Sequence, residues 1–228
     1  MTARRLGIMG AMDSETSALR AAIEDAVEET VLGCTLASGL LDGQPVVLAT
    51  SGVGKVNAAL TTAAMATAGV DELVFTGVAG GVGDGLQQGD VVIATTLVQH
   101  DVDVTVFGRM SGYIGERPAG GPADEALSAR LVDACRSLGL EPVRGVIASG
   151  DQFIADKARA HDIARRFGAV AVEMEGAAVA QVCTRLGLPF ACLRWVSDAA
   201  DDDALDDAED FIGRAAGLDL AVMRAFVG

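Results

Sequence analysis

Short apolar segments alternate with amphipathic ones along most of this chain, and this alternation is the feature that most limits its possible folds. Apolar runs rich in Val, Ile and Leu are typical of strands buried on both faces. We expect strands at Leu6–Met12, Val46–Ser51, Glu72–Thr76, Asp90–Val98, Gly145–Ser149, Ala169–Val172 and Phe190–Val196. We expect helices at Ser14–Asp25, Lys55–Ala68, Asp124–Leu138, Asp156–Phe167, Gly176–Leu186 and Asp207–Val227. This order predicts an α/β fold with three layers, α/β/α, and a mixed, mostly parallel central sheet.

Nothing in the sequence divides the chain into separate units. A length of 228 residues suffices for one sizeable core, so we expect a single domain over residues 1–228. The loosest region is Gly108–Ala123, which is rich in Gly and Pro. We expect it to form a long surface loop, and loops of this length often serve as lids or subunit contacts.

The charge balance limits the partners that this protein can have. A formal net charge of −15 repels phosphate backbones, so we expect no nucleic-acid partner and favour a neutral or zwitterionic small molecule. No apolar run approaches the ~18 residues that a membrane span needs. The N-terminal residues lack the basic and long apolar segments of a secretion signal, and the four cysteines are scattered. We therefore expect a cytoplasmic protein with free thiols.

Acidic residues follow three of the expected strands. Glu15 comes after the first apolar run, Glu175 after the run that ends at Val172, and Asp198 after the run that ends at Val196. Ligands of open α/β sheets bind outside the carboxyl ends of the strands. We expect these three carboxylates to share one site.

Two glycine-rich segments could be taken for nucleotide-binding loops, but their spacing does not match the known motifs. Gly77–Gly85 follows a strand but lacks the GxGxxG pattern of dinucleotide loops, and Ser51–Val56 lacks the first Gly and the hydroxyl residue of a P-loop. Glycines there more simply allow the backbone to approach a ligand. His100 and His161 are the only histidines, and we expect no metal site and no hydrolase triad.

Taken in order, several motifs resemble those of the 5′-methylthioadenosine/S-adenosylhomocysteine nucleosidases, within the purine nucleoside phosphorylase superfamily. The matching segments cover essentially the whole chain: Gly7–Glu15, Ser51–Asn57, Thr76–Gly81, His100–Thr105, Ser149–Ile154, Val172–Glu175 and Arg194–Asp198. The resemblance implies a nucleoside phosphorylase-like fold and an enzyme that needs neither metal nor cofactor. It also implies hydrolysis of the N-glycosidic bond of 5′-methylthioadenosine or S-adenosylhomocysteine, with 5′-deoxyadenosine as a further candidate substrate.

The resemblance assigns a catalytic role to each carboxylate. Asp198 would protonate adenine N7, and Glu175 would bind the ribose hydroxyls beside the developing oxocarbenium ion. Glu15 would act as the general base on water, and Arg194 would orient the water and the carboxylates. An aspartic acid is normally ionised at neutral pH (pKa ~3.9), so the pocket must favour its protonated form or obtain the proton from solvent.

The resemblance also implies a set of substrate-binding residues. Phe153 would stack on adenine, the Ile154 backbone would bind the edge of the base, and Met12 and Met174 would form apolar walls around the ribose. The remaining candidates are Val53, Val78, Ala79, Gly80, Val104, Phe107, Gln152, Glu173 and Ser197. Core packing is the alternative for Phe153 and Met174. For Glu173, which faces away from Glu175 in an extended segment, the alternative is a structural hydrogen bond.

Three alternative functions remain at this stage. A purine nucleoside phosphorylase would need basic residues around phosphate, but the first loop offers Asp13 and Glu15, and Thr76–Gly81 has no basic residue. A hydrolase of the same fold that acts on a futalosine-like nucleoside is a closer alternative. A catalytically silent nucleoside-binding protein would lack one of the three carboxylates.

The sequence departs from the family pattern at a few positions. Val78 replaces a common Ser, which removes a hydrogen bond to the attacking water, and Ala208 replaces an aromatic residue. Arg109 and Gly115 stand where an aromatic residue and a proline are common in the loop that a neighbouring subunit contributes. The resemblance implies a homodimer, and these departures leave the preferred 5′ substituent open.

Overall fold

One long sheet carries most of the strands in the computed structural model, which describes residues 4–200 and 204–228 except the side chains of residues 206, 207, 209 and 210. The order of strands across it is β10-β7-β11-β12-β6-β13-β5-β1-β4-β3-β2. Their bounds are β1 Leu6–Gly10, β2 Glu24–Val31, β3 Cys34–Leu41, β4 Gln44–Thr50, β5 Glu72–Phe75, β6 Val78–Gly81, β7 Val91–Gln99, β10 Gly120–Pro122, β11 Val143–Ser149, β12 Ala169–Glu173 and β13 Phe190–Asp198.

The sheet is mixed, as its sequence predicts. Parallel pairings join β4, β1, β5, β13 and β6 in turn, and also join β7, β11 and β12. The strand β13 is buried along its whole length, and it pairs with β7 as well as with β5 and β6. Its antiparallel pairing with β7 closes β7, β11, β12, β6 and β13 into a ring. The sheet is therefore curled at this end, which brings the ends of β12 and β13 close together.

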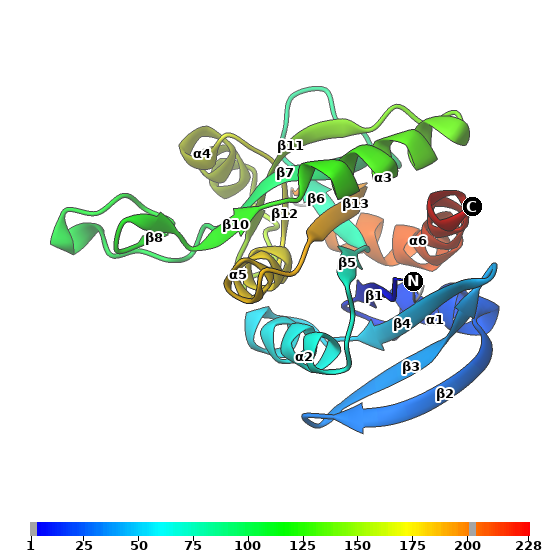
Figure 1. The fold of residues 1–228 in the computed structure, drawn as a ribbon. Helices are drawn as coiled ribbons and strands as arrows, with labels where there is room; N and C mark the ends of the chain where they lie inside the picture. Colours follow the sequence, from blue (N-terminus) through cyan, green and yellow to red (C-terminus); the bar gives the residue numbers. More distant parts are fainter. Residues whose placement is uncertain (1–3, 201–203) are drawn as a thin grey trace.

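Helices cover both faces of the sheet and complete the three expected layers. The helices α1 (Asp13–Ala22), α3 (Glu125–Ser137) and α6 (Ala204–Val227) pack together on one face, and α2 (Lys55–Thr67) packs against α5 (Gly176–Leu186) on the other (Figure 1). The helix α4 (Lys157–Phe167) packs on β11 and β12. Within the described residues no helix is long and apolar enough to cross a membrane.

Local signals in the sequence account for several helix ends. The Asp124 side chain accepts a hydrogen bond from Leu127 N at the start of α3 (2.8 Å), and the Asp156 side chain accepts one from Arg159 N at the start of α4 (2.7 Å). Gly168 and Gly187 end α4 and α5 in the left-handed conformation, which costs glycine little. These helices therefore begin and end within a residue or two of the predicted bounds.

The prediction of a helix at Ser14–Asp25 is wrong at its C-terminal end. The helix α1 ends at Ala22, and Glu24 begins β2, which forms an antiparallel hairpin with β3 that the sequence analysis did not identify. Nearly every residue of β2 is exposed, so the alternation of apolar and polar residues that identifies a half-buried strand is missing. The strand β6 was also missed, because its glycines suggested a loop.

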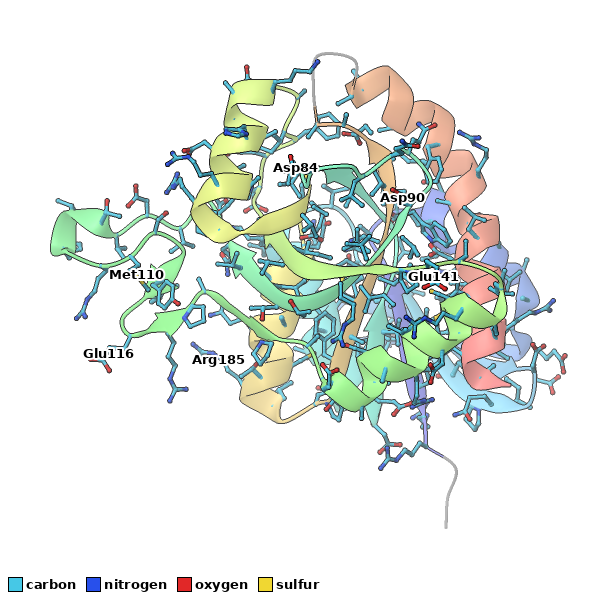
Figure 2. All side chains as sticks on the ribbon, turned by 90° about the horizontal axis from the view of Figure 1, so that it is seen from above. Asp84, Asp90, Met110, Glu116, Glu141 and Arg185 are labelled. Atoms are coloured by element: carbon cyan, nitrogen blue, oxygen red, sulfur yellow. The ribbon has the colours of Figure 1, made fainter. Side chains whose placement is uncertain are left out.

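The segment Gly108–Ala123 is an arm that projects from the body of the molecule (Figure 1). It follows the short 3₁₀ helix η1 (Thr105–Phe107), and it contains the hairpin of β8 (Tyr113–Ile114) and β9 (Arg117–Pro118) before β10 joins the sheet. Met110 and Glu116 lie on this arm, away from the helical layers (Figure 2). The expected long loop is therefore present, but it contains short strands.

Candidate active site

A largely apolar cavity of about 230 Å³ lies where β1, β12 and β13 end. Glu15, Glu175 and Asp198 all line it, so the three carboxylates that follow separate strands do converge. The other expected residues that line it are Met12, Val53, Val78, Ala79, Gly80, Gln152, Phe153, Ile154, Glu173, Met174 and Ser197. Ala11, Val172 and Ile212 also line it, and sequence reasoning did not identify them.

Glu15 is held by backbone donors from two segments. Its Oε2 accepts hydrogen bonds from Ala11 N (2.8 Å) and Met12 N (2.9 Å), and its Oε1 accepts one from Val78 N (3.0 Å). The residue is in the first turn of α1, where a carboxylate reaching back to free N–H groups is favoured. A carboxylate has about four lone-pair sites. Two donors occupy Oε2 and one occupies Oε1, which leaves Oε1 with room for one more donor.

Glu173 organises the polar floor of the site. Its carboxylate accepts hydrogen bonds from Ser149 Oγ, from Gly176 N (2.8 Å) and from Arg194 Nη2 (2.8 Å). Arg194 is buried beneath the cavity rather than in its wall, and its guanidinium stacks on the ring of Phe75 at 3.8 Å. Glu173 is thus saturated by structural donors, which fits the alternative of a structural hydrogen-bond partner.

Glu175 is a buried carboxyl group with few donors. Its Oε1 accepts a hydrogen bond from Gly54 N (2.6 Å), the residue before α2. Burial raises the pKa of Glu175 to about 8, the charge of Glu173 adds to this, and the Gly54 hydrogen bond and Arg194 oppose it. Burial beside Glu173 thus favours the protonated form of Glu175 in the free protein.

Asp198 ends β13 and is held by its neighbours. Its Oδ2 accepts a hydrogen bond from Ser197 Oγ (2.6 Å), and its Oδ1 accepts one from Ala200 N (2.8 Å). A Cβ atom at Gly80 would lie 3.0 Å from Asp198 Oδ1, so the bare backbone of β6 lets this carboxyl group approach. The glycine-rich segment thus serves close packing around Asp198, in line with the expectation that its backbone approaches the site.

Besides Arg194, the expected residues that do not line this cavity lie in η1, in the residue before it and in the arm. Val104 precedes η1, and Phe107 is 78% exposed at its end, so neither forms part of the wall in this chain. Arg109 and Gly115 are exposed on the same arm. Ala208 of α6, by contrast, lines the cavity together with Ile212. Across residues 4–200 and 204–228, no group of three or more His, Cys, Asp or Glu is placed to hold a metal ion.

Comparison with known proteins agrees with this architecture. A family model described as the phosphorylase superfamily matches residues 5–228. The 5′-methylthioadenosine/S-adenosylhomocysteine nucleosidase of Anoxybacillus flavithermus is 42% identical and covers 92% of each chain, and that of Shewanella piezotolerans is 39% identical and covers 96% of each.

Solved structures show the same fold. The 5′-methylthioadenosine/S-adenosylhomocysteine nucleosidase of Neisseria meningitidis, in complex with methylthio-immucillin-A, has a TM-score of 0.93 at 38% identity and covers 98% of both chains. The futalosine hydrolase of Helicobacter pylori has a TM-score of 0.93 at 36% identity and covers 98% of this chain and 97% of its own. By sequence and by fold, this chain belongs to the 5′-methylthioadenosine/S-adenosylhomocysteine nucleosidase family of the phosphorylase superfamily.

Proposed function

We propose that this protein hydrolyses the N-glycosidic bond of 5′-methylthioadenosine or S-adenosylhomocysteine to adenine and the 5′-thio-substituted ribose. The observation that carries the proposal is the convergence of Glu15, Glu175 and Asp198 on one apolar cavity. The relatives at 39–42% identity have this activity in their names, which supports the same assignment. The cavity offers apolar surface for a purine and a thioether, and carboxyl groups for the polar atoms between them.

The leaving base needs a proton, and we assign its delivery to Asp198. Breaking the glycosidic bond leaves electrons on the purine, so an acid at N7 stabilises the departing adenine. Ser197 and Ala200 fix the carboxyl group of Asp198 at the end of β13. Phe153, whose side chain is 51% exposed at the cavity, provides a face on which the base can stack.

The ribose becomes positively charged in the transition state, and we assign its stabilisation to Glu175. Its hydrogen bond to Gly54 N orients the carboxyl group, and ribose hydroxyls would supply further donors. A developing cation nearby favours the ionised carboxylate more strongly in the transition state than in the free protein, and such differential binding accelerates a reaction.

Water is the proposed nucleophile, with Glu15 as its general base. The remaining lone-pair site of Glu15 Oε1 could accept the proton of a water molecule. Among the described residues none that lines the cavity is basic, and the buried Arg194 is engaged with Glu173. A phosphate dianion would therefore meet carboxylates without compensating cations, which argues against phosphorolysis.

A second candidate is hydrolysis of futalosine, because the Helicobacter pylori enzyme of that name matches the fold as closely as the nucleosidases do. The same acid, base and ribose-binding groups would serve either substrate. The two candidate substrates differ in the group at the 5′ position. Ala208 and Ile212 of α6 line the cavity, and we propose that they contribute to the selection between these two substrates.

We also propose a cytoplasmic location and a role in the salvage of methionine from methylthioadenosine. The four cysteines are free, which suits a reducing compartment. Removal of methylthioadenosine and adenosylhomocysteine produces adenine and a thio-sugar that other enzymes can recycle.

Finally, we propose a homodimer in which each arm reaches the cavity of the partner. The exposed face at the start of α2 is apolar, with Val56 79% and Leu60 45% exposed, and η1 at the base of the arm exposes Val106 and Phe107 (86% and 78%). Lys55 Nζ at the start of α2 is paired with Asp101 (2.7 Å), in the segment that leads from β7 to η1. An apolar surface of this kind indicates a protein contact. Phe107 and Arg109 would then act at the site of the neighbouring subunit.

The reaction class can be tested by supplying methylthioadenosine in phosphate-free buffer. We expect free adenine and free methylthioribose, with no increase in rate when phosphate is added, because water attacks the ribose. Chromatography of the products and a parallel assay with adenosylhomocysteine and futalosine would identify the preferred substrate. Turnover that requires phosphate would reject the hydrolase.

The roles of the acid and the base predict the effects of two isosteric variants. Asp198→Asn and Glu15→Gln should each lower kcat by about 10²–10⁴-fold, the usual contribution of general acid–base catalysis. The folded state should persist, as judged by circular dichroism, with the exposed Asp84→Asn and Glu141→Gln as matched controls (Figure 2). Near-normal turnover by either active-site variant would contradict its assignment.

The raised pKa of Glu175 predicts how stability depends on pH. Between the ordinary value of 4.5 and about 8 the folded chain keeps a proton that the unfolded chain releases, so folding becomes less favourable as pH rises through this window. Glu175→Gln removes this effect. Its Tm should exceed that of the wild type at pH 8.5, and the difference should shrink towards pH 5. An equal difference at both values would show that the titration of Glu175 is not the cause.

The dimer can be tested with a charge in the proposed interface. In analytical ultracentrifugation the wild type should have twice the monomer mass of 23.2 kDa, whereas Val56→Asp should be monomeric. The variant should also have a higher KM for methylthioadenosine, because the partner's arm is lost. Leu138→Asp is the control, since Leu138 is 44% exposed at the end of α3 on the opposite face of the sheet. A monomeric wild type with full activity would refute the proposal.

A further inference from the structure

A fully buried carboxyl group outside the cavity has no role in the steps above. Asp219 lies on α6 with none of its surface exposed. Its Oδ1 accepts hydrogen bonds from Trp195 Nε1 (2.8 Å) and from Thr76 Oγ1. Its Oδ2 has no hydrogen-bond partner in the part of the chain that the structure describes. One carboxylate oxygen of α6 thus joins the end of β5 to the middle of β13.

The two donors border the turn that holds Glu15. Thr76 immediately precedes Gly77, and Trp195 N donates to Gly77 O (2.9 Å). Val78 N, on the other side of Gly77, donates to Glu15 Oε1 (3.0 Å). A Cβ atom at Gly77 would lie 2.4 Å from the same oxygen, so backbone and carboxylate are in direct contact. Any movement of this turn therefore moves the environment of Glu15 Oε1.

We propose that Asp219 is a positioning residue, which joins Thr76 to Trp195 and thereby holds the Gly77–Val78 turn against Glu15. This rests on the proposed function, in which Glu15 Oε1 accepts a proton from water. Asp219 does not touch the cavity, so its effect reaches the reaction only through the turn. Catalytic groups must be held to a fraction of an ångström, and residues beneath them provide this precision.

The energetics of Asp219 favour a role beyond holding α6 on the sheet. Burial raises the pKa of Asp219 to about 7, the hydrogen bonds from Thr76 and Trp195 oppose this, and the charge of Glu15 on α1 adds to it while Arg194 on β13 opposes it. An acid in such a place makes folding less favourable as pH rises towards 7. Well-packed apolar side chains often replace buried charged groups without loss of stability. A carboxyl group that only held α6 on the sheet would therefore be a costly choice.

The test compares variants that remove one hydrogen bond each. Thr76→Val keeps the shape of the side chain and deletes its donor, and Trp195→Phe deletes the indole donor with a smaller aromatic ring. We expect both to lower kcat by about 10-fold or more, since misplacing a catalytic group by ~1 Å costs up to ~10²-fold, with KM changed less than kcat. Thr62→Val is the matched control, because Thr62 is equally buried on α2 and donates only within its own helix. Its kcat should equal that of the wild type.

Substitution of the acceptor gives a second measurement. Asp219→Asn retains an oxygen that accepts from both donors and should keep most of the wild-type kcat, whereas Asp219→Ala should lose as much as the donor variants. A purely structural anchor would instead lower Tm in all of these variants and leave kcat and the pH profile of the folded enzyme unchanged. That result would overturn the proposal.

A double-mutant comparison separates this proposal from the assignment of Glu15 itself. If Thr76 acts through Glu15, adding Thr76→Val to Glu15→Gln should cause no further loss of kcat. An equal loss in both backgrounds would overturn the positioning role. Near-wild-type turnover of Glu15→Gln alone would refute the assignment of Glu15 as base, and that outcome is read independently of Thr76.

Discussion

The concentration of carboxyl groups in a buried, apolar site is the constraint on which the rest of this structure depends. Glu15, Glu173, Glu175 and Asp198 all line one cavity, and each is at most 8% exposed. Charges of one sign in such a place repel one another and are poorly solvated. Each carboxyl group is accommodated in a different way. Backbone N–H groups donate to Glu15, the buried guanidinium of Arg194 pairs with Glu173, and the pKa of Glu175 is raised.

These solutions differ because the proposed roles differ. Glu173 is fully engaged by Arg194, Ser149 and the backbone, and so its side chain is held in one position. Glu175 has one backbone donor and a pKa of about 8, so it can gain charge as the ribose becomes cationic. If every carboxyl group already accepted its full set of hydrogen bonds, the folded protein would be more stable. None of these groups would then interact more strongly with the transition state than with the substrate.

The sequence predicted the central layers well because their signal is local. The buried strand Phe190–Asp198 begins with a run of mostly apolar residues, and the caps Asp124 and Asp156 mark helix starts. The hairpin of β2 and β3 was missed because β2 faces solvent, which removes the apolar alternation. The convergence of the three carboxylates was predictable for a related reason, since each follows a strand of one sheet.

The missed parts of the site depend on contacts between distant segments. Ile212 and Asp219 lie on one long helix, and nothing in their spacing shows that one lines the cavity and the other accepts from Trp195. Arg194 was expected at the reacting atoms. It lies four residues before Asp198 and would share its face in a regular strand, but the pairing of β13 with β6 shifts register between Val196 and Asp198. Asp198 therefore reaches the cavity while Arg194 packs beneath it, on Phe75. Which residues of β13 face the site thus depends on its pairings with strands that are distant in sequence.

The helix α6 contributes both to the wall of the cavity and to the contacts behind Glu15. Ala208 and Ile212 line the cavity, and Asp219 lies on the same helix further along. If Asp219 positions the Gly77–Val78 turn, then the helix that borders the substrate also sets the geometry of Glu15. A 5′ substituent that moved α6 would then change the rate of water attack as well as binding. Selection for a new substrate at Ala208 would act on kcat and KM together, because both depend on the position of one rigid element.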